Sequence, residues 1–151
     1  MTTRMQRFPL ALCGLLAVAA QAQAPGHYCG QLQPHPIDAA FAQATERSDG
    51  VTADMRDAQE IAYTAWDAEL NGVYRGLMQR LGDGAAARAL RQAQRAWLAW
   101  DRAETESDIA QVAAEGTSGP LIVSELARER RRHRSCTLQR AHPTVEAQGV
   151  D

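Results

Sequence analysis

The chain contains no lysine, so all 16 of its basic side chains are arginines, and 18 acidic side chains oppose them. A phosphate-binding loop needs a lysine beside its glycines, and the missing lysine excludes that function for the glycines around Thr117 and Ser118. The small excess of negative charge argues against nucleic acid as a partner, because nucleic-acid binding needs clustered positive charge. The same excess is compatible with a basic protein partner.

The chain also lacks strand-like alternation, internal repeats and any apolar run that reaches the about 20 residues of a transmembrane helix. Its longest apolar stretch, residues 8–20, follows Arg4 and Arg7 and ends in the small-x-small sequence Ala20-Gln21-Ala22. This pattern predicts a signal peptide, residues 1–22, which is removed after Ala22. The mature protein is then expected in the periplasm or outside the cell.

Two other processing events fit the first residues less well. Cleavage after Ala24 would place Pro25 directly behind the cut, where signal peptidase is hampered. Lipid attachment at Cys13 needs a small residue before the cysteine, and Leu12 stands there. The preferred cleavage leaves 129 residues with 14 arginines and 18 carboxylates, the size of one small domain.

Only two cysteines, Cys29 and Cys136, remain in the mature chain. An oxidising compartment makes their pairing the expected outcome, and the disulfide would close a long loop. A metal site built from Cys29, His27 and His35 is disfavoured, because these ligands are too few and too irregularly spaced for zinc. We therefore expect no metal and no cofactor.

The periodicity predicts an all-α fold, a small antiparallel bundle with a long helical hairpin, a third long helix and a short N-terminal helix. Residues 23–50 are expected to form an extended leader with a short helix over Ile37–Thr45. The first long helix, capped by Thr52, carries an apolar stripe at helical spacing: Ala62, Trp66, Leu70, Val73, Leu77 and Leu81. The second, from Ala85, repeats the pattern with Leu90, Ala93, Trp97 and Trp100.

The two stripes are expected to face each other across the turn Gly82-Asp83-Gly84, with Trp66 and Leu70 interlocking with Leu90 and Trp97 as the core. Of the two neighbouring tryptophans on the second helix, one ring is expected to be partly exposed. The third helix is expected to begin at Pro120 and end before His142-Pro143, which leaves residues 142–151 as a flexible tail. Its arginine-rich segment, Arg128–Arg134, is typical of a solvated face.

A row of polar residues accompanies the hairpin stripes. Asp67, Asn71 and Tyr74 share one side of the first long helix, and Gln94 lies on the second. They either contact a ligand or serve the packing of the seam, and the second interpretation is favoured, with Asn71 and Gln94 paired to each other or to nearby backbone, because buried amides must be paired. The arginines of the second helix, Arg88, Arg91 and Arg95, are expected to face solvent.

Catalysis is not expected. The acidic residues Asp101, Glu104 and Asp108 share a helical face, which is typical of a hydrated or arginine-paired surface. No serine lies in a recognisable arrangement with a histidine.

Taken together, the order and spacing of these residues resemble the LprI-type lysozyme-inhibitor domain, a small secreted or periplasmic helical module of bacteria. The residues that carry the resemblance span 52–138, within a helical domain predicted for 51–141, and they are Thr52-Ala53-Asp54-Met55, Tyr63, Asp67, Leu70, Asn71, Tyr74, Leu77, Leu81, Leu90, Ala93-Gln94, Trp97 and Gly116-Thr117-Ser118.

The chain departs from the family pattern at its cysteines. Positions that commonly hold cysteine in the family hold Ala58, Thr105 and Glu125 here, so Cys29 and Cys136 would substitute for the family's disulfides. Where an Arg-Asp pair usually follows the Trp helix, this chain has Asp101-Arg102.

The resemblance implies a non-enzymatic protein that binds and inhibits a peptidoglycan-degrading enzyme, such as a lysozyme-like hydrolase. The partner-binding residues would then be those of a protruding loop: Glu115, Gly116, Thr117, Ser118 and Gly119. Two alternatives remain, an immunity protein against a cell-wall-targeting toxin and an envelope adaptor that uses the Arg128–Arg134 face.

Overall fold

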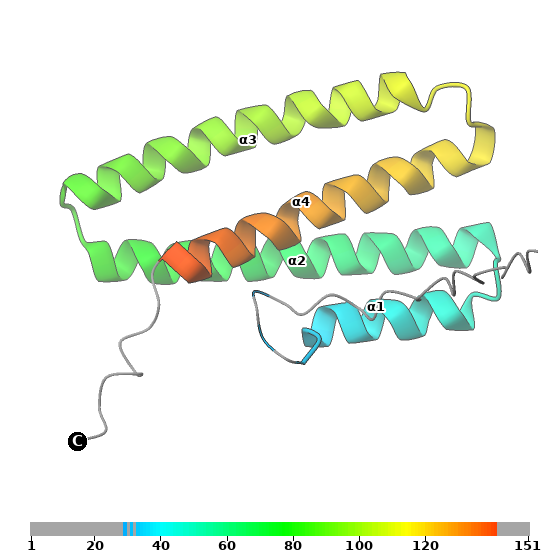
Figure 1. Ribbon diagram of the computed structural model, residues 1–151, viewed down its shortest axis with the longest axis horizontal. Helices are drawn as coiled ribbons and strands as arrows, with labels where there is room; N and C mark the ends of the chain where they lie inside the picture. Colours follow the sequence, from blue (N-terminus) through cyan, green and yellow to red (C-terminus); the bar gives the residue numbers. More distant parts are fainter. Residues whose placement is uncertain (1–28, 30, 32, 142–151) are drawn as a thin grey trace, which may run out of the picture.

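A computed structural model describes residues 29, 31 and 33–141, and every long regular element among them is a helix (Figure 1). This confirms the predicted all-α bundle. The predicted signal peptide, the start of the leader and the tail 142–151 lie outside the described residues. In chain order the elements are α1 (Pro36–Arg47), α2 (Thr52–Leu81), α3 (Ala85–Gln111), the short 3₁₀ helix η2 (Gly116–Ser118) and α4 (Gly119–Ala141).

The helices alternate in direction along the chain, so α4 runs parallel to α2 (Figure 1). The α1–α2 turn and the α3–α4 loop lie at one end of the bundle, and the α2–α3 turn lies at the other. The most extensive contact joins α2 and α4, and α2 touches α3 much less. α4 therefore packs against both helices of the α2–α3 hairpin, and the core does not lie only at the contact between α2 and α3.

Local chemistry explains where the helices begin and end. Pro36 opens α1, and the His35 ring nitrogen Nδ1 accepts a hydrogen bond from the Ile37 backbone N–H at 3.3 Å. The predicted cap at Thr52 is wrong, because Val51 holds the capping position of α2 and Thr52 is already helical. Gly82 ends α2 with φ of +58°, a backbone conformation that suits glycine.

The apolar core forms two clusters. Leu70, Leu77 and Leu138 make one, and Leu90 and Trp97 pack against it, so Leu70 and the α3 residues expected beside it belong to the same cluster. Burying each of these side chains contributes about 1.5 to 3 kcal/mol.

The other cluster surrounds Trp66, which is fully buried against Cys136, with Cys29 and Ile37 beside it. The expectation that Trp66 meets Leu90 and Trp97 is therefore wrong. The ring lies against α1, α4 and the disulfide instead, because α1 covers that face of α2.

The buried face of α3 is rotated from the predicted stripe. Ala93 faces outward and Trp100 is 48% exposed, so the partly exposed ring that the sequence predicted is Trp100. The residues that turn inward include polar ones: Ala87, Leu90, Gln94, Trp97, Asp101 and Asp108. Polar residues suit these positions because α4 presents arginines to them.

Candidate functional site

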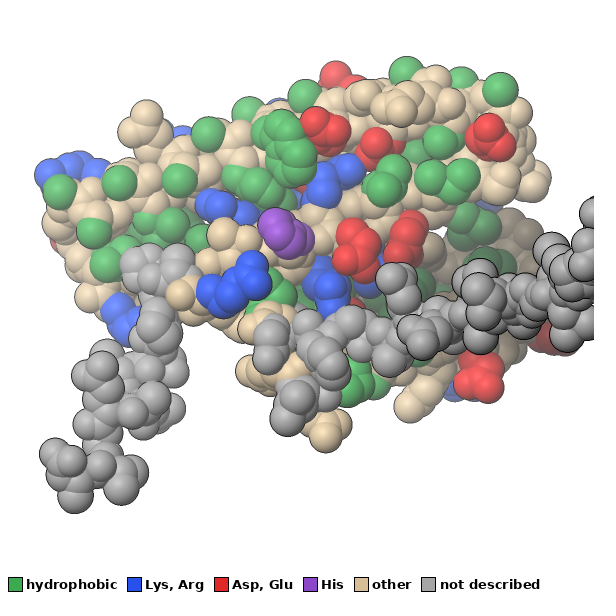
Figure 2. Space-filling view, in the orientation of Figure 1, with side chains coloured by type: hydrophobic (Ala, Val, Ile, Leu, Met, Phe, Trp, Pro, Cys, Tyr) green, Lys and Arg blue, Asp and Glu red, His purple; other side chains and the backbone are tan. Residues whose placement is uncertain are grey.

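The arginine-rich segment of α4 is the centre of the bundle. Arg128 is 4% exposed and Arg131 is 8% exposed, so the predicted solvated face at Arg128–Arg134 is wrong. Arg128, Arg131, Ser135 and Leu138 follow steps of three, four and three, the spacing of a core stripe. Figure 2 shows acidic and basic side chains side by side along the middle of one face. The arginines are buried because the other helices supply partners for them.

Two of these arginines bind α3. Arg130 Nε donates to Asp101 at 2.9 Å and Nη1 donates to Asp108 at 2.6 Å, while Nη2 donates to the Thr105 hydroxyl at 2.8 Å. Arg131 approaches the other Asp101 oxygen at 2.6 Å. Both aspartates are buried, so the arginine-paired interpretation of this acidic face is confirmed and the hydrated one is wrong for them. Each of the two carboxylates is therefore matched by a guanidinium group of α4.

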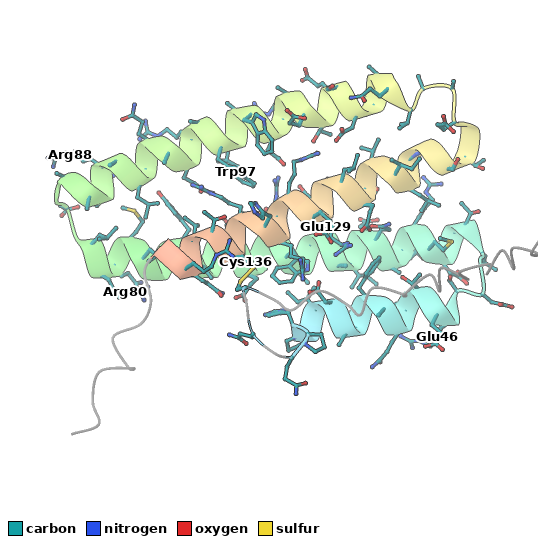
Figure 3. The ribbon with its side chains drawn as sticks, viewed as in Figure 1. Glu46, Arg80, Arg88, Trp97, Glu129 and Cys136 are labelled. Atoms are coloured by element: carbon teal, nitrogen blue, oxygen red, sulfur yellow. A yellow bond between two sulfur atoms is a disulfide. The ribbon has the colours of Figure 1, made fainter. Side chains whose placement is uncertain are left out.

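Arg131 also joins α4 to α2. Its Nε donates to Asp67 at 2.9 Å, and its Nη2 donates to the Tyr63 hydroxyl at 3.0 Å. Its guanidinium lies 4.9 Å from the centre of the ring of Trp97, the α3 residue labelled in Figure 3. One side chain thus contacts residues of α2 and α3 together. Such a shared partner fixes the relative positions of the three helices.

Burial and pairing act in opposite directions on these guanidinium groups. Burial alone would lower the pKa of Arg130, but the hydrogen bonds to Asp108 and Asp101 outweigh it and raise the pKa. The pKa of Arg131 is raised in the same way, chiefly by the hydrogen bond to Asp101 against the effect of burial. Burial lowers the pKa of Arg134, whose hydrogen bond goes to a neutral amide.

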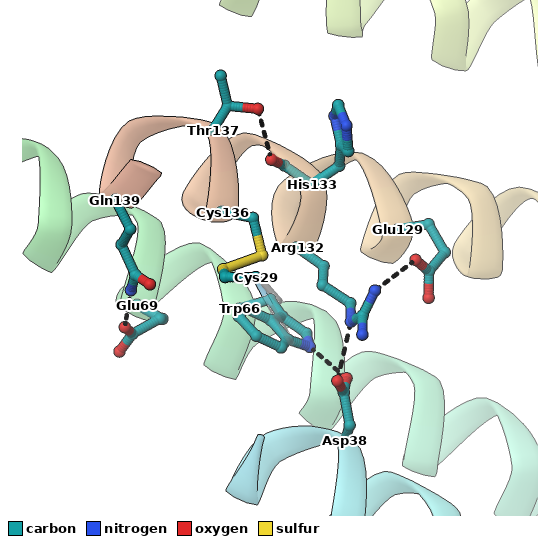
Figure 4. The surroundings of a disulfide bond; sticks show 10 residues. All are labelled: Cys29, Asp38, Trp66, Glu69, Glu129, Arg132, His133, Cys136, Thr137 and Gln139. Atoms are coloured by element: carbon teal, nitrogen blue, oxygen red, sulfur yellow. Dashed lines mark hydrogen bonds and ion pairs between the residues drawn. A yellow bond between two sulfur atoms is a disulfide. The ribbon is translucent and has the colours of Figure 1, made fainter. Parts of the chain in front are cut away.

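Asp38 of α1 collects a second group of contacts beside the disulfide (Figure 4). Its Oδ1 accepts from the Trp66 indole N–H at 3.1 Å, and its Oδ2 accepts from Arg132 Nε at 2.8 Å. The Cys29–Cys136 disulfide, predicted from the sequence, joins the start of the described chain to α4 across 107 residues. Asp38 and the disulfide together hold α1 against α2 and α4.

Asn71 and Gln94 pair with charged side chains, so the predicted bonds to each other or to nearby backbone are wrong. Asn71 Nδ2 donates to Asp67 at 2.9 Å on its own helix, and Gln94 Oε1 accepts from Arg134 Nε at 3.0 Å. The arginines of α4 compete for these acceptors because a guanidinium is a stronger donor than an amide. The polar row nevertheless shares one surface: Asp67, Asn71, Tyr74 and Gln94 line a groove of about 290 Å³ between α2 and α3.

The loop between α3 and α4 is exposed but held by its own bonds. The Glu115 backbone N–H donates to the Val112 carbonyl at 2.9 Å, and the Ser118 hydroxyl donates to the Glu115 carbonyl at 2.7 Å. Glu115, Gly116, Thr117 and Ser118 are exposed, whereas Gly119 is buried so closely that an added Cβ would lie 2.9 Å from the Val112 carbonyl oxygen. The loop therefore presents its small polar groups in one conformation.

Within 29, 31 and 33–141, no cluster of three or more histidine, cysteine or acidic side chains is arranged to hold a metal ion. None of the described helices has an apolar stretch sufficient to cross a bilayer.

The site is thus a four-helix bundle in which Asp101 and Asp108 are paired with arginines of α4, with an exposed loop held by its own hydrogen bonds. Residues 42–138 match the family model of the lysozyme inhibitor LprI, and the chain belongs to this family. The match covers parts or all of each helix that forms the site. No curated protein and no solved structure matches the chain significantly.

Sequence reasoning missed the structural role of the α4 arginines and of Asp38. A signal for the arginines is present in the sequence: residues 128–135 contain no apolar side chain, yet they lie in the middle of a long helix between Leu126 and Leu138. A helix that must be buried there needs charged partners, and Asp101 and Asp108 are spaced two turns apart to supply them. Asp38 has no such signal, because it lies in the first turn of a helix, where an acidic residue is ordinary.

Proposed function

We propose that this protein is exported after removal of residues 1–22 and that the mature chain binds and inhibits a peptidoglycan-cleaving hydrolase of the lysozyme kind, without catalysing a reaction itself. Membership of the LprI family supports the inhibitory role. The Cys29–Cys136 disulfide supports a location outside the cytoplasm, because such bonds persist in oxidising compartments.

The observation that carries the proposed binding surface is the ordered exposure of the α3–α4 loop. Gly116, Thr117 and Ser118 at its tip are small, and the bonds of Glu115 and Ser118 hold its conformation, so little freedom is lost on binding. Glycoside hydrolases use two carboxylates in their cleft. The hydroxyl of exposed Thr117 is a donor suited to such carboxylates.

An immunity protein against a wall-degrading toxin would use the same surface, and only the identity of the target would differ. The adaptor alternative requires an exposed Arg128–Arg134 face. It is disfavoured because the guanidinium groups of Arg128 and Arg131 are buried against the other helices.

The test is a lysis assay with the purified mature chain and soluble hydrolases of several lysozyme types, with lytic enzymes encoded beside the gene included. Turbidity of a cell-wall suspension should fall more slowly in proportion to added protein for at least one enzyme. Undiminished lysis by every enzyme at a large excess of the protein would contradict the proposal. Selective inhibition of the neighbouring toxin would identify an immunity protein.

A further inference from the structure

The groove between α2 and α3 lies far from the α3–α4 loop. Its walls carry Asn71 and Tyr74 from α2, and Arg91, Gln94 and Arg95 from α3. Arg91 is 20 residues from the end of α3 at Gln111, which corresponds to about 30 Å along the helix axis. The groove is therefore a separate surface from the loop.

Hydrogen-bond acceptors of this groove already have donors within the protein. Both oxygens of Asp67 accept bonds, one from Arg131 Nε and one from Asn71 Nδ2, each at 2.9 Å. The Gln94 Oε1 atom accepts from Arg134 Nε at 3.0 Å. Arg131 and Arg134 of α4, together with Asn71, therefore already occupy these acceptors, whereas the donors Arg91 and Arg95 also line the groove.

Those donors carry positive charge. Arg91 is half-buried and Arg95 is exposed, and neither forms an ion pair or a hydrogen bond with any residue that the structure describes. Arg128, Arg130, Arg131 and Arg132 of α4, in contrast, all have carboxylate partners. Two adjacent guanidinium groups, an amide and a phenol in one groove form a site for an anionic acceptor, and a carboxylate fits the planar geometry of guanidinium best.

We propose that this groove binds the carboxylate side chain of an aspartate or glutamate on the surface of the target hydrolase, as a second contact outside the catalytic cleft. The inference rests on the proposed inhibitory function. A groove of about 290 Å³ accommodates a side chain and not a helix, and its charge complements an acidic residue.

The experiment measures the affinity of the full mature chain for an inhibited hydrolase by calorimetry. The double variant Arg91→Ala/Arg95→Ala should bind at least about tenfold more weakly, because desolvated arginines at interfaces are common energetic hot spots. Arg91→Lys/Arg95→Lys should restore part of the affinity, since the charge returns without the planar fork. Arg102→Ala is the matched control, an exposed arginine of α3 outside the groove, and should change affinity by less than about twofold.

The outcomes separate the two proposals. If the wild-type chain inhibits but the double variant binds equally well, the groove proposal is overturned and the inhibitory function stands. If the double variant loses binding to a soluble disaccharide-peptide of the cell wall while its affinity for the enzyme is unchanged, the groove is a glycan site and the proposal is also overturned. If the wild-type chain inhibits no hydrolase, the proposed function is wrong, and so is the assignment of a hydrolase side chain to the groove. NMR titration with N-acetylglutamate then tests the groove itself, through the response of the side-chain N–H signals of Arg91 and Arg95 to a carboxylate.

Discussion

Arg131 of α4 and Asp101 of α3 form an ion pair of 2.6 Å in the interior of the bundle, where both side chains are at least nine-tenths buried. The same aspartate accepts a hydrogen bond from Arg130, so two guanidinium groups share it. Breaking a buried pair by removing one partner leaves the other charge uncompensated in a poorly solvated place. Asp101 is therefore the residue whose loss should damage the fold most.

Asp101→Ala should lower the free energy of unfolding by about 3 to 5 kcal/mol, since Arg130 and Arg131 would both lose a buried partner. Urea denaturation followed by circular dichroism measures this change. Glu106→Ala, an exposed acidic residue on the same helix, is the control and should change the value by less than about 0.5 kcal/mol. Equal effects of the two variants would mean that the buried ion pairs do not stabilise the bundle.

Arg134 is expected to tolerate replacement better than Arg131. Its guanidinium binds only the neutral Gln94 and the face of Trp97 among the described residues, and burial lowers its pKa. Arg134→Met should therefore change the free energy of unfolding by less than about 1 kcal/mol, whereas Arg131→Met should cost about 1.5 to 3 kcal/mol, because Asp101 loses one of its two arginine partners and Asp67 loses its bond to Arg131. Denaturation of the two variants side by side tests this ranking, and a reversed order would contradict it.

The apolar half of the fold was predictable because its signal is periodic. The stripe of Ala62, Trp66, Leu70 and Leu77 predicts the buried face of α2 correctly, and glycine and proline mark the turns. The polar half was not predictable in the same way. A hydrophobic pattern cannot distinguish an arginine that faces water from one that faces Asp101, since the difference lies in a partner about 30 residues away in the sequence.

The candidate site shows the same division. The loop at Glu115–Gly119 follows from its glycines, whereas the groove at Arg91 and Arg95 does not, because solvent-facing charge was the natural interpretation of both arginines. In the groove, Arg131 donates to a carboxylate oxygen of Asp67, and Arg134 donates to the amide oxygen of Gln94. Only the packing of α4 reveals that these acceptors are already occupied.

Removal of the disulfide should destabilise the protein without changing its helical content at low temperature. Cys29→Ser/Cys136→Ser opens a loop of 107 residues, and the expected loss is about 2 to 5 kcal/mol in the free energy of unfolding. Thermal melting with and without a reducing agent measures it. Reductant should lower the melting temperature of the wild type to that of the variant and leave the variant unchanged.

Two glycine substitutions should act in opposite directions. Gly119→Ala forces a Cβ within 2.9 Å of the Val112 carbonyl oxygen, and this overpacking should cost about 1 to 3 kcal/mol and disturb the α3–α4 loop. Gly72→Ala lies inside α2 with no atom within 4 Å of the new Cβ, and it should stabilise the fold by about 0.5 to 1 kcal/mol. Chemical denaturation gives both signs, and a stabilising Gly119→Ala would show that the loop is not tightly held.

A bulky residue at the tip of the loop should separate binding from stability. Thr117 is exposed, so Thr117→Trp should leave the melting temperature unchanged while inhibition of the target hydrolase weakens by about tenfold or more, because the ring prevents close approach. Thr64→Trp, an equally exposed position on α2, is the matched control. Full inhibition by Thr117→Trp would place the binding surface elsewhere.

The distribution of charge between α4 and the rest of the chain bears on how the molecule assembles. Residues 29–118 contain 14 carboxylates and 8 arginines, while residues 119–141 contain six arginines and two glutamates. α4 thus carries a net positive charge (6 − 2 = +4) and the residues before it a net negative charge (8 − 14 = −6), and long-range attraction accelerates the docking of α4. Refolding should accordingly slow as ionic strength rises, and a chain truncated before α4 should remain an expanded, self-repelling polyacid.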